Sequence, residues 1–262
     1  MKGNEPGYVA LWRSGELARR AVRARSALTD CKLCAQACGV DRTAHPERGR
    51  CRTGVRAAVH GAGPHHGEEA PLRGSRGSGT IFFGGCNLRC VYCQNWDISQ
   101  CPSGPVRSTP ELAHLMLRLQ AAGCHNVNLV SPSHVVAPIL EALDAATAGG
   151  LRLPLVYNTG GYDALETLEL LDGVVDVYMP DAKYGLEGLG EALSGAPDYE
   201  RVNREAIAAM HAQVGDLELD SGGLAVRGLL VRHLVLPGMP ENTDSVLRFL
   251  AEEVSPNTFV NV

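Results

Sequence analysis

Residues 80–93 read TIFFGGCNLRCVYC, an apolar run followed directly by two glycines and three cysteines. The β-branched and aromatic residues of the run predict a buried strand. The two glycines let the backbone wrap closely around a group held by the next loop, because glycine adopts conformations that other residues avoid. Cys86, Cys90 and Cys93 are therefore predicted on one loop at the carboxyl end of this strand.

Strand-like and helix-like runs alternate from this strand to the end of the chain. Strands are predicted at 80–84, 126–131, 154–158, 174–179, 228–236 and 257–262. Helices are predicted at 109–122, 134–148, 163–171, 197–214 and 243–254, the first with Thr109 as N-cap and Pro110 at its first position. The alternation indicates βαβ crossovers and a parallel sheet. Six strands favour an α/β fold with an open or partial (β/α) barrel, whose active site lies at the carboxyl ends of the strands.

The chain before residue 80 has a different character. An amphipathic helix is predicted at 11–28, and a cysteine-rich stretch follows at 31–51. Residues 60–79 are rich in Gly and Pro and predict a linker or irregular loop. We therefore expect an N-terminal helix and cysteine-rich segment at 1–75 and a barrel at 76–262.

Composition excludes several classes of protein. With 262 residues, 45% hydrophobic and 20% charged, the chain fits neither a disordered nor a collagen-like nor a coiled-coil protein. It has no apolar run near the roughly 20 residues that span a bilayer, and no signal peptide, so a cytoplasmic location is expected. The net charge of −5 gives no sign of a nucleic-acid-binding surface. All nine cysteines lie between Cys31 and Cys124, which favours metal or redox chemistry over disulfides.

The spacing C-x3-C-x2-C of Cys86, Cys90 and Cys93 suits three irons of a cubane iron–sulfur cluster and leaves the fourth iron open. The alternative is a zinc site or three free thiols, although zinc prefers four ligands and paired C-x2-C motifs. With Tyr92 just before the last cysteine, the loop resembles that of the radical S-adenosylmethionine (radical SAM) superfamily. The resemblance implies a partial (β/α)6 barrel, a 4Fe–4S cluster, and S-adenosylmethionine cleaved by one electron to a 5′-deoxyadenosyl radical that abstracts hydrogen.

Residues at the strand ends acquire roles through this resemblance. It implies that the main chain around Tyr92 contacts adenine and that Ser131 or nearby carbonyls hold the methionine amine, although the family's Gly-Gly-Glu stretch is absent here. It also implies that the cosubstrate is bound by Asn158, Thr159, Gly160, Asp181, Lys183 and Arg232, with Asp181 and Lys183 as the catalytic pair and Arg232 on the methionine carboxylate. Ordinary strand-to-helix loops, an exposed Asp–Lys pair and an inward-facing His233 are the alternatives.

Longer stretches narrow the resemblance. Residues 78–100 (SGTIFFGGCNLRCVYCQNWDISQ), 156–162 (VYNTGGY), 176–184 (DVYMPDAKY) and 231–238 (VRHLVLPG) resemble the pyruvate formate-lyase activating-enzyme-like branch. The branch implies an enzyme that acts on a glycyl residue of a partner enzyme and receives electrons from a reductant such as flavodoxin or ferredoxin. A peptide, nucleoside or small metabolite is the alternative target. A non-catalytic iron–sulfur or zinc-binding protein is the alternative class.

Six cysteines lie outside the loop. The pattern Cys31-x2-Cys34-x3-Cys38-x12-Cys51 predicts a second metal site, for zinc or an iron–sulfur cluster, with reduced thiols near the first cluster as the alternative. Cys101 and Cys124 are predicted as small core residues. His60, His65 and His66 are expected in a solvated loop, with a metal-binding tract as the alternative.

Overall fold

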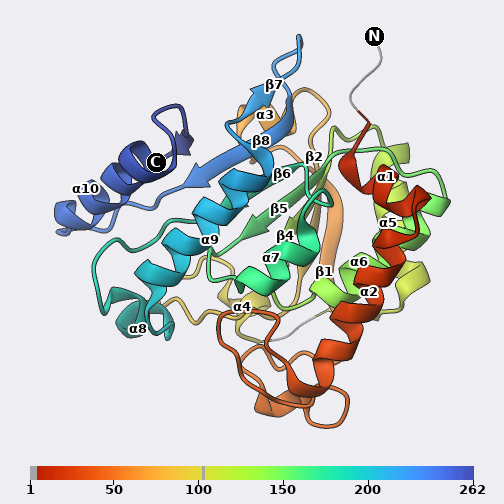
Figure 1. Ribbon diagram of the computed structural model, residues 1–262, viewed down its shortest axis with the longest axis horizontal. Helices are drawn as coiled ribbons and strands as arrows, with labels where there is room; N and C mark the ends of the chain where they lie inside the picture. Colours follow the sequence, from red (N-terminus) through yellow and green to blue (C-terminus); the bar gives the residue numbers. More distant parts are fainter. Residues whose placement is uncertain (1–4, 102–103) are drawn as a thin grey trace.

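The computed structural model describes residues 5–101 and 104–262. One sheet organises this part of the chain, in the strand order β3-β1-β2-β4-β5-β6-β8-β7, with β9 paired to β8 (Figure 1). Its strands are β1 (Ala57–His65), β2 (Ser78–Phe83), β3 (Val106–Arg107), β4 (Val127–Val130), β5 (Leu155–Thr159), β6 (Val177–Pro180), β7 (Glu218–Leu219), β8 (Ala225–Arg232) and β9 (Phe259–Asn261).

The six predicted strands correspond to β2, β4, β5, β6, β8 and β9, and each pairs with the next in parallel. Helices connect them, so the predicted α/β fold with a partial (β/α)6 barrel is confirmed. Because parallel strands share one direction, their carboxyl ends meet at a single edge of the sheet.

Helices cover the outer face of the sheet (Figure 1). The helices of the described residues are α1 (Gly7–Arg13), α2 (Glu16–Ser26), α3 (Ala70–Arg73), α4 (Trp96–Ser99), α5 (Thr109–Ala121), α6 (Val136–Ala148), α7 (Leu165–Leu171), α8 (Leu189–Ser194), α9 (Tyr199–Val214) and α10 (Pro240–Phe249), which continues as a π-helical turn at Leu250–Val254. Two short helices lie elsewhere than on the outer face: α3 packs through Leu72 in the cluster with Val156 on the other face, and α4 borders the cavity at the strand ends. Short 3-10 turns lie at Ala27–Asp30 and Pro46–Arg48. In the part of the chain that the structure describes, no helix is both long and apolar enough to cross a bilayer.

Two helix predictions need correction. The helix predicted at 11–28 is two helices, because Gly15 has a φ of 73° and interrupts the regular backbone between α1 and α2. The N-cap of α5 is Ser108 and not Thr109. Ser108 forms a capping box with Glu111, whose carboxylate accepts hydrogen bonds from the Ser108 N–H and hydroxyl at 2.8 and 2.6 Å.

The linker predicted at 60–79 is also wrong. Most of its first part belongs to β1, which runs antiparallel to β2 with His65 opposite Ser78, and its middle contains α3. Glycine and proline obscured this strand in the sequence, but they are tolerated because β1 lies near the edge of the sheet. β1 precedes residue 76, so the sheet draws on both predicted parts of the chain. The division at that residue stays a prediction.

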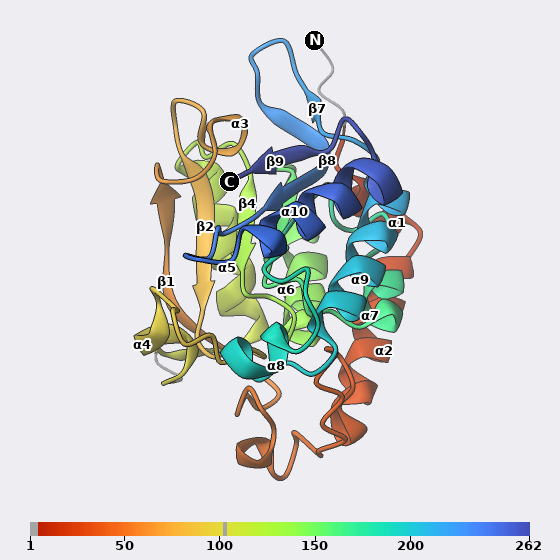
Figure 2. The ribbon, with the colours of Figure 1, turned by 90° about the vertical axis from the view of Figure 1, so that its left-hand side faces the viewer.

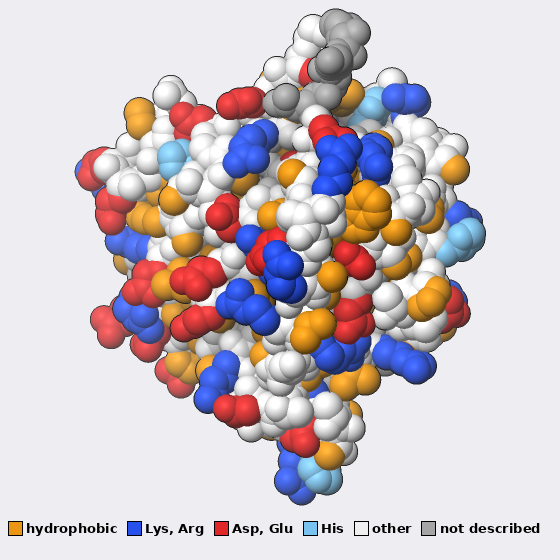
Figure 3. Space-filling view, turned by 45° about the vertical axis from the view of Figure 1, so that its right-hand side comes forward, with side chains coloured by type: hydrophobic (Ala, Val, Ile, Leu, Met, Phe, Trp, Pro, Cys, Tyr) orange, Lys and Arg blue, Asp and Glu red, His pale blue; other side chains and the backbone are white. Residues whose placement is uncertain are grey.

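Both faces of the central strands are buried, which is typical of a parallel sheet. In β5, Leu155 and Tyr157 pack in the large core under the helices, whereas Val156 packs in a smaller cluster with Val177 and Met179. The alternation of side chains places the following Asn158 on the same face as Val156. At the protein surface, the face shown in Figure 3 carries basic and acidic side chains interspersed with one another.

Candidate functional site

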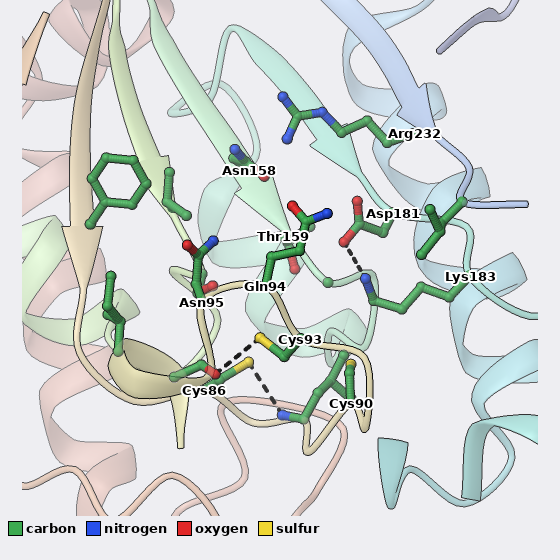
Figure 4. A pocket seen from close by; sticks show the side chains of 18 of the residues that line it. Cys86, Cys90, Cys93, Gln94, Asn95, Asn158, Thr159, Asp181, Lys183 and Arg232 are labelled. Carbon is green, nitrogen blue, oxygen red and sulfur yellow. Dashed lines mark hydrogen bonds and ion pairs between the residues drawn. The ribbon is translucent and has the colours of Figure 1, made fainter. Parts of the chain in front are cut away.

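A cavity of about 520 Å³ opens at the carboxyl ends of the parallel strands. Residues from β4, β5 and β8, from the loop after β2 and from the segment that follows β6 line it (Figure 4). All the residues predicted for the cluster and the cosubstrate are among them: Cys86, Cys90, Tyr92, Cys93, Ser131, Asn158, Thr159, Gly160, Asp181, Lys183 and Arg232. Residues from five separate segments therefore meet in one space.

The three loop cysteines lie at one end of the cavity, where the sulfur atoms of Cys86 and Cys93 face one another (Figure 4). Each sulfur has a donor nearby. The Leu88 N–H donates to Cys86 Sγ at 3.4 Å, the Ser194 hydroxyl donates to Cys90 Sγ at 3.0 Å, and Ser99 Oγ lies 3.2 Å from Cys93 Sγ. Such donors stabilise thiolate charge.

The chemistry of this donor set fits an iron–sulfur cluster. Thiolates are the ligands that these clusters take, and three of them leave one iron for another ligand. Burial raises the pKa of Cys86 to about 11, so this thiol is neutral until a metal replaces its proton. Among the described His, Cys, Asp and Glu side chains, no three are already arranged as a metal ligand set. A cluster therefore has to draw the three thiols toward a common centre.

The start of the loop is held by contacts with three other segments of the chain. Gly85 has a φ of 87°, and a β-carbon there would lie 3.1 Å from Cys51 O. His134 Nε2 lies 3.0 Å from Gly84 O, and the Asn87 side chain donates to Tyr162 O at 2.7 Å. The second of the two predicted glycines is thus required both by backbone conformation and by close approach.

Asp181 and Lys183 form an ion pair on the cavity wall after β6, with 2.5 Å between Asp181 Oδ2 and Lys183 Nζ (Figure 4). Their side chains are 27% and 14% exposed, so this is not an exposed surface pair. Burial alone would lower the pKa of Lys183, but the negative charge of Asp181 outweighs burial and raises it above its usual range. Lys183 is therefore a cation at neutral pH.

Two residues of α9 hold these strand ends in place. Tyr199 Oη lies 2.7 Å from Gly160 O and 2.9 Å from Asp181 O. The Asn203 side chain donates to Gly161 O and to Asp181 O, both at 2.9 Å. Both residues escaped the sequence prediction, although two polar side chains four residues apart on one helix face were the available signal.

Comparison with known proteins identifies the family. The model of the radical SAM superfamily matches residues 80–215, which is more than half of the chain. The chain belongs to the radical SAM superfamily. Membership implies an enzyme that uses S-adenosylmethionine together with a 4Fe–4S cluster.

Relatives of this radical SAM protein include two uncharacterized proteins of Methanocaldococcus jannaschii. MJ0674 is 32% identical over 249 residues, which cover 91% of this chain and 66% of the relative. MJ0808 is 25% identical over 189 residues, covering 68% of this chain and 50% of the relative. The chain thus spans about two thirds and one half of the lengths of these relatives. Among solved structures, native anSMEcpe with bound AdoMet is similar over 68% of this chain and 48% of its own, with a TM-score of 0.47 and 12% identity.

Arg232 reaches the radical SAM cavity from the end of β8, but its guanidinium is already paired. Nε and Nη2 donate to the two oxygens of Glu69 at 2.6 and 2.7 Å, and Nη2 also donates to Glu68. Both glutamate side chains are almost fully buried, at 5% and 6% exposed. Glu68 and Glu69 were not predicted as site residues, because they lie in the stretch that was predicted to be a linker. The signal available in the sequence was that two acidic residues are adjacent there. The role of Arg232 on the methionine carboxylate stays a prediction.

Some polar groups of the other strand-end residues are already hydrogen-bonded within the protein. Thr159 Oγ1 donates to Asp163 at 2.6 Å, so its hydroxyl is engaged within the protein. Ser131 has a φ of 56°, and its N–H bonds to Asn158 O at 2.9 Å. His233 also lines the cavity, but its two ring nitrogens lie 2.6 Å from Ala182 O and 2.9 Å from the Thr243 hydroxyl, so both are engaged within the protein.

The remaining cysteines and histidines separate into distinct environments. Cys31, Cys34, Cys38 and Cys51 line a second cavity of about 10 Å³. Cys124 is buried, as predicted, but the prediction for Cys101 is wrong because Cys101 is exposed. His65 lies in a strand and not in a solvated loop, and its ring packs edge-on against Phe82 at 5.8 Å. His60 belongs to the same strand, and His66 follows it directly.

The Glu69–Arg232 pair leads to a prediction about stability. Burial raises the pKa of Glu69, but the hydrogen bonds and charge of Arg232 outweigh it and hold that pKa below its usual range. Glu69→Gln should remove about 1.5–3 kcal/mol of stability at neutral pH, because hydrogen bonds to charged groups are worth about that much. For a chain of this size we expect the midpoint of thermal unfolding to fall by about 3–6 °C.

The difference in stability between the wild-type protein and Glu69→Gln should shrink as the pH falls. A group whose folded pKa is lowered stabilises the protein above its unfolded pKa of about 4.3, and this contribution is lost as the pH falls below that value. Thermal unfolding followed between pH 7 and pH 3 should therefore show the two proteins converging in acid. The exposed Glu166 provides the control, because Glu166→Gln should change the midpoint little at any pH. A difference that persists undiminished in acid would contradict the assignment.

Proposed function

We propose that this radical SAM protein holds a 4Fe–4S cluster on Cys86, Cys90 and Cys93 and reductively cleaves S-adenosylmethionine in the cavity beside it. The observation that carries this proposal is that one cavity gathers the three thiols and the Asp181–Lys183 pair from different strands. When bound, the cluster supplies the electron that splits the sulfonium. The protein supplies binding and orientation, which is the usual division of work in cofactor enzymes.

Several cavity residues then have a task in binding the cosubstrate. The ammonium of Lys183 attracts the methionine carboxylate, and the carboxylate of Asp181 attracts the methionine amine. Asn158, Ser131 and the backbone at Thr159 and Gly160 complete the wall along this portion. The main chain around Tyr92 contacts adenine, while the Tyr92 hydroxyl is fixed by Tyr184 at 2.6 Å. Positioning of this kind lowers the entropic part of the barrier.

Exposed apolar side chains around the rim of the cavity favour a macromolecular target. Val91 is 72%, Trp96 60% and Leu234 51% exposed, and all three lie on segments that border the cavity. Exposed apolar groups beside an active site are typical of protein-binding surfaces. We infer that the radical acts on a glycyl residue of a partner enzyme in the cytoplasm, with a reductant such as flavodoxin or ferredoxin. This target agrees with the branch that the sequence resembles.

Deuterium transfer tests the proposal. The protein is reconstituted with iron and sulfide under anaerobic conditions, reduced with dithionite and mixed with S-adenosylmethionine. A glycyl radical enzyme labelled with α-deuterated glycine is added as the candidate partner. We expect deuterium in 5′-deoxyadenosine and a glycyl radical signal by electron paramagnetic resonance. No 5′-deoxyadenosine from cluster-loaded protein would refute the reaction. Product without deuterium would refute the activating role and favour a peptide or small metabolite.

A further inference from the structure

The second cysteine group lies outside the reaction proposed above. We propose that Cys31, Cys34, Cys38 and Cys51 bind one structural zinc ion, and that this ion braces the loop that carries Cys86. The four residues come from the loops between α2 and β1, at the same end of the molecule as α4 and α8 (Figure 1, Figure 2). The zinc site does not depend on the proposed reaction, whereas its bracing role rests on it.

Local turns bring the four cysteines together. The Cys31 N–H donates to Val40 O at 3.0 Å, and the Gly39 N–H donates to Cys31 O at 3.0 Å, which folds the segment back on itself. The Ala37 N–H donates to Cys34 O at 2.9 Å and closes a tight turn. All four side chains line one cavity of about 10 Å³, although they span 21 positions of sequence from Cys31 to Cys51.

The surroundings of these sulfur atoms are arranged for negative charge. The Arg50 N–H donates to Cys38 Sγ at 3.5 Å, and Arg42 Nη1 donates to Cys31 Sγ at 3.6 Å. Hydrogen bonds to sulfur are the outer contacts that tune metal thiolates.

Arg42 gives an independent indication of an anion at this place. The residue is only 2% exposed, and the other partners of its guanidinium are the neutral carbonyl oxygens of Thr53 and Gly54, at 2.7 and 2.9 Å. Within the described residues, no carboxylate forms an ion pair with it. Buried charges are normally paired, and metal-bound thiolates would supply the missing negative charge.

Zinc fits this site better than an iron–sulfur cluster does. Structural zinc takes four thiolates in a closed tetrahedron, and the C-x2-C pair of Cys31 and Cys34 has the usual spacing. The cavity of about 10 Å³ suits a single ion and not a cubane of eight atoms. The ion would replace four thiol protons and draw the sulfur atoms inward, since the thiols alone are not yet arranged as a ligand set.

Contacts with the loop after β2 connect the two cysteine groups. The Gln36 side chain donates to Asn87 O at 2.8 Å, and Arg89 Nη2 donates to Arg50 O at 2.6 Å. His134 lines the small cavity and also contacts Gly84 O at 3.0 Å. A zinc ion that fixes the segment from Cys31 to Cys51 would therefore also fix the loop that presents Cys86.

Metal analysis of the full chain tests the site. Protein is expressed with added zinc and purified without iron reconstitution, and its zinc and iron are measured by mass spectrometry. We expect about one zinc per chain, also in the triple variant Cys86→Ala, Cys90→Ala, Cys93→Ala. In Cys31→Ser and Cys38→Ser, competition with a chelator should show zinc affinity reduced by about 100-fold or more. Cys101→Ser changes an exposed cysteine outside the site and should keep its zinc.

Three outcomes would overturn the proposal: wild-type protein without zinc, zinc affinity unchanged in both serine variants, or iron and sulfide in place of zinc in the triple variant. Cys38 is exposed, so Cys38→Ser should fold, which far-ultraviolet circular dichroism checks. After reconstitution, Cys38→Ser should hold several-fold less cluster iron than Cys101→Ser, and equal iron would refute the bracing role. Zinc in the triple variant does not depend on cleavage of S-adenosylmethionine, so this test and the test of function can fail separately.

Discussion

Cys90→Ala should abolish both the visible absorption of the 4Fe–4S cluster and the release of 5′-deoxyadenosine. The variant leaves two thiols where three are needed, so the cluster loses a ligand and the site loses its electron source. Losing a residue that only supports a metal ligand already costs about 10–100-fold, and losing the ligand itself should cost more than 100-fold. Anaerobic reconstitution followed by absorption spectroscopy and chromatography of the nucleoside products measures both signals.

Two matched variants make this result interpretable. Cys101→Ser removes an exposed cysteine and should retain both signals. Cys124→Ser changes a buried core cysteine and reports any general effect of altering a thiol in this protein. Retained cleavage in Cys90→Ala, with unchanged cluster iron, would place the cluster elsewhere and refute the assignment of the loop.

Asp181→Asn should have the second largest effect. It leaves the ammonium of Lys183 in a cavity wall without its carboxylate partner, which lies 2.5 Å away in the native protein. Breaking a buried ion pair costs 3–5 kcal/mol, and we expect about 2 kcal/mol here because Asp181 keeps 27% exposure. Affinity for S-adenosylmethionine should fall by about 100-fold, since the methionine amine loses a charged partner.

A double variant separates stability from binding. Asp181→Asn with Lys183→Met removes both charges and should recover most of the lost stability, because no unpaired ion remains. Binding of S-adenosylmethionine should stay as weak as in the single variant or become weaker. Thermal unfolding without cosubstrate and calorimetric titration with it measure the two quantities. Recovery of binding in the double variant would show that the pair only supports the strand end.

The contribution of the Asp181–Lys183 pair to stability should be constant over a defined range of pH. Because the pKa of Lys183 is raised in the folded protein, its contribution to stability is present below the unfolded pKa of about 10.4 and is lost as the pH rises through the folded value. The stability difference between wild type and the double variant should therefore be constant between pH 6 and pH 9.

The sequence predicted the six parallel strands and the residues that meet in the cavity. Each parallel strand is a contiguous run whose alternation with helices is visible locally, and residues at successive strand ends must share one edge of the sheet. The prediction failed at β1, because its glycines and proline mimic a loop and its pairing with β2 is a contact between separate segments. It failed at α5 by one residue, because Ser108 forms its capping box through a side chain.

The sequence by itself determined the fold class and the position of the three-cysteine loop, because each is encoded in a short stretch of the chain: a strand, two glycines and C-x3-C-x2-C. Only the tertiary structure decided which groups surround them. Glu69 and Arg232 are separated by 163 positions, and Gln36 and Asn87 by 51, so no local sequence pattern could predict either contact. Side-chain partners of this kind depend on how the chain packs in three dimensions. They determine whether the guanidinium of Arg232 is free to bind a ligand and how firmly the loop after β2 is held.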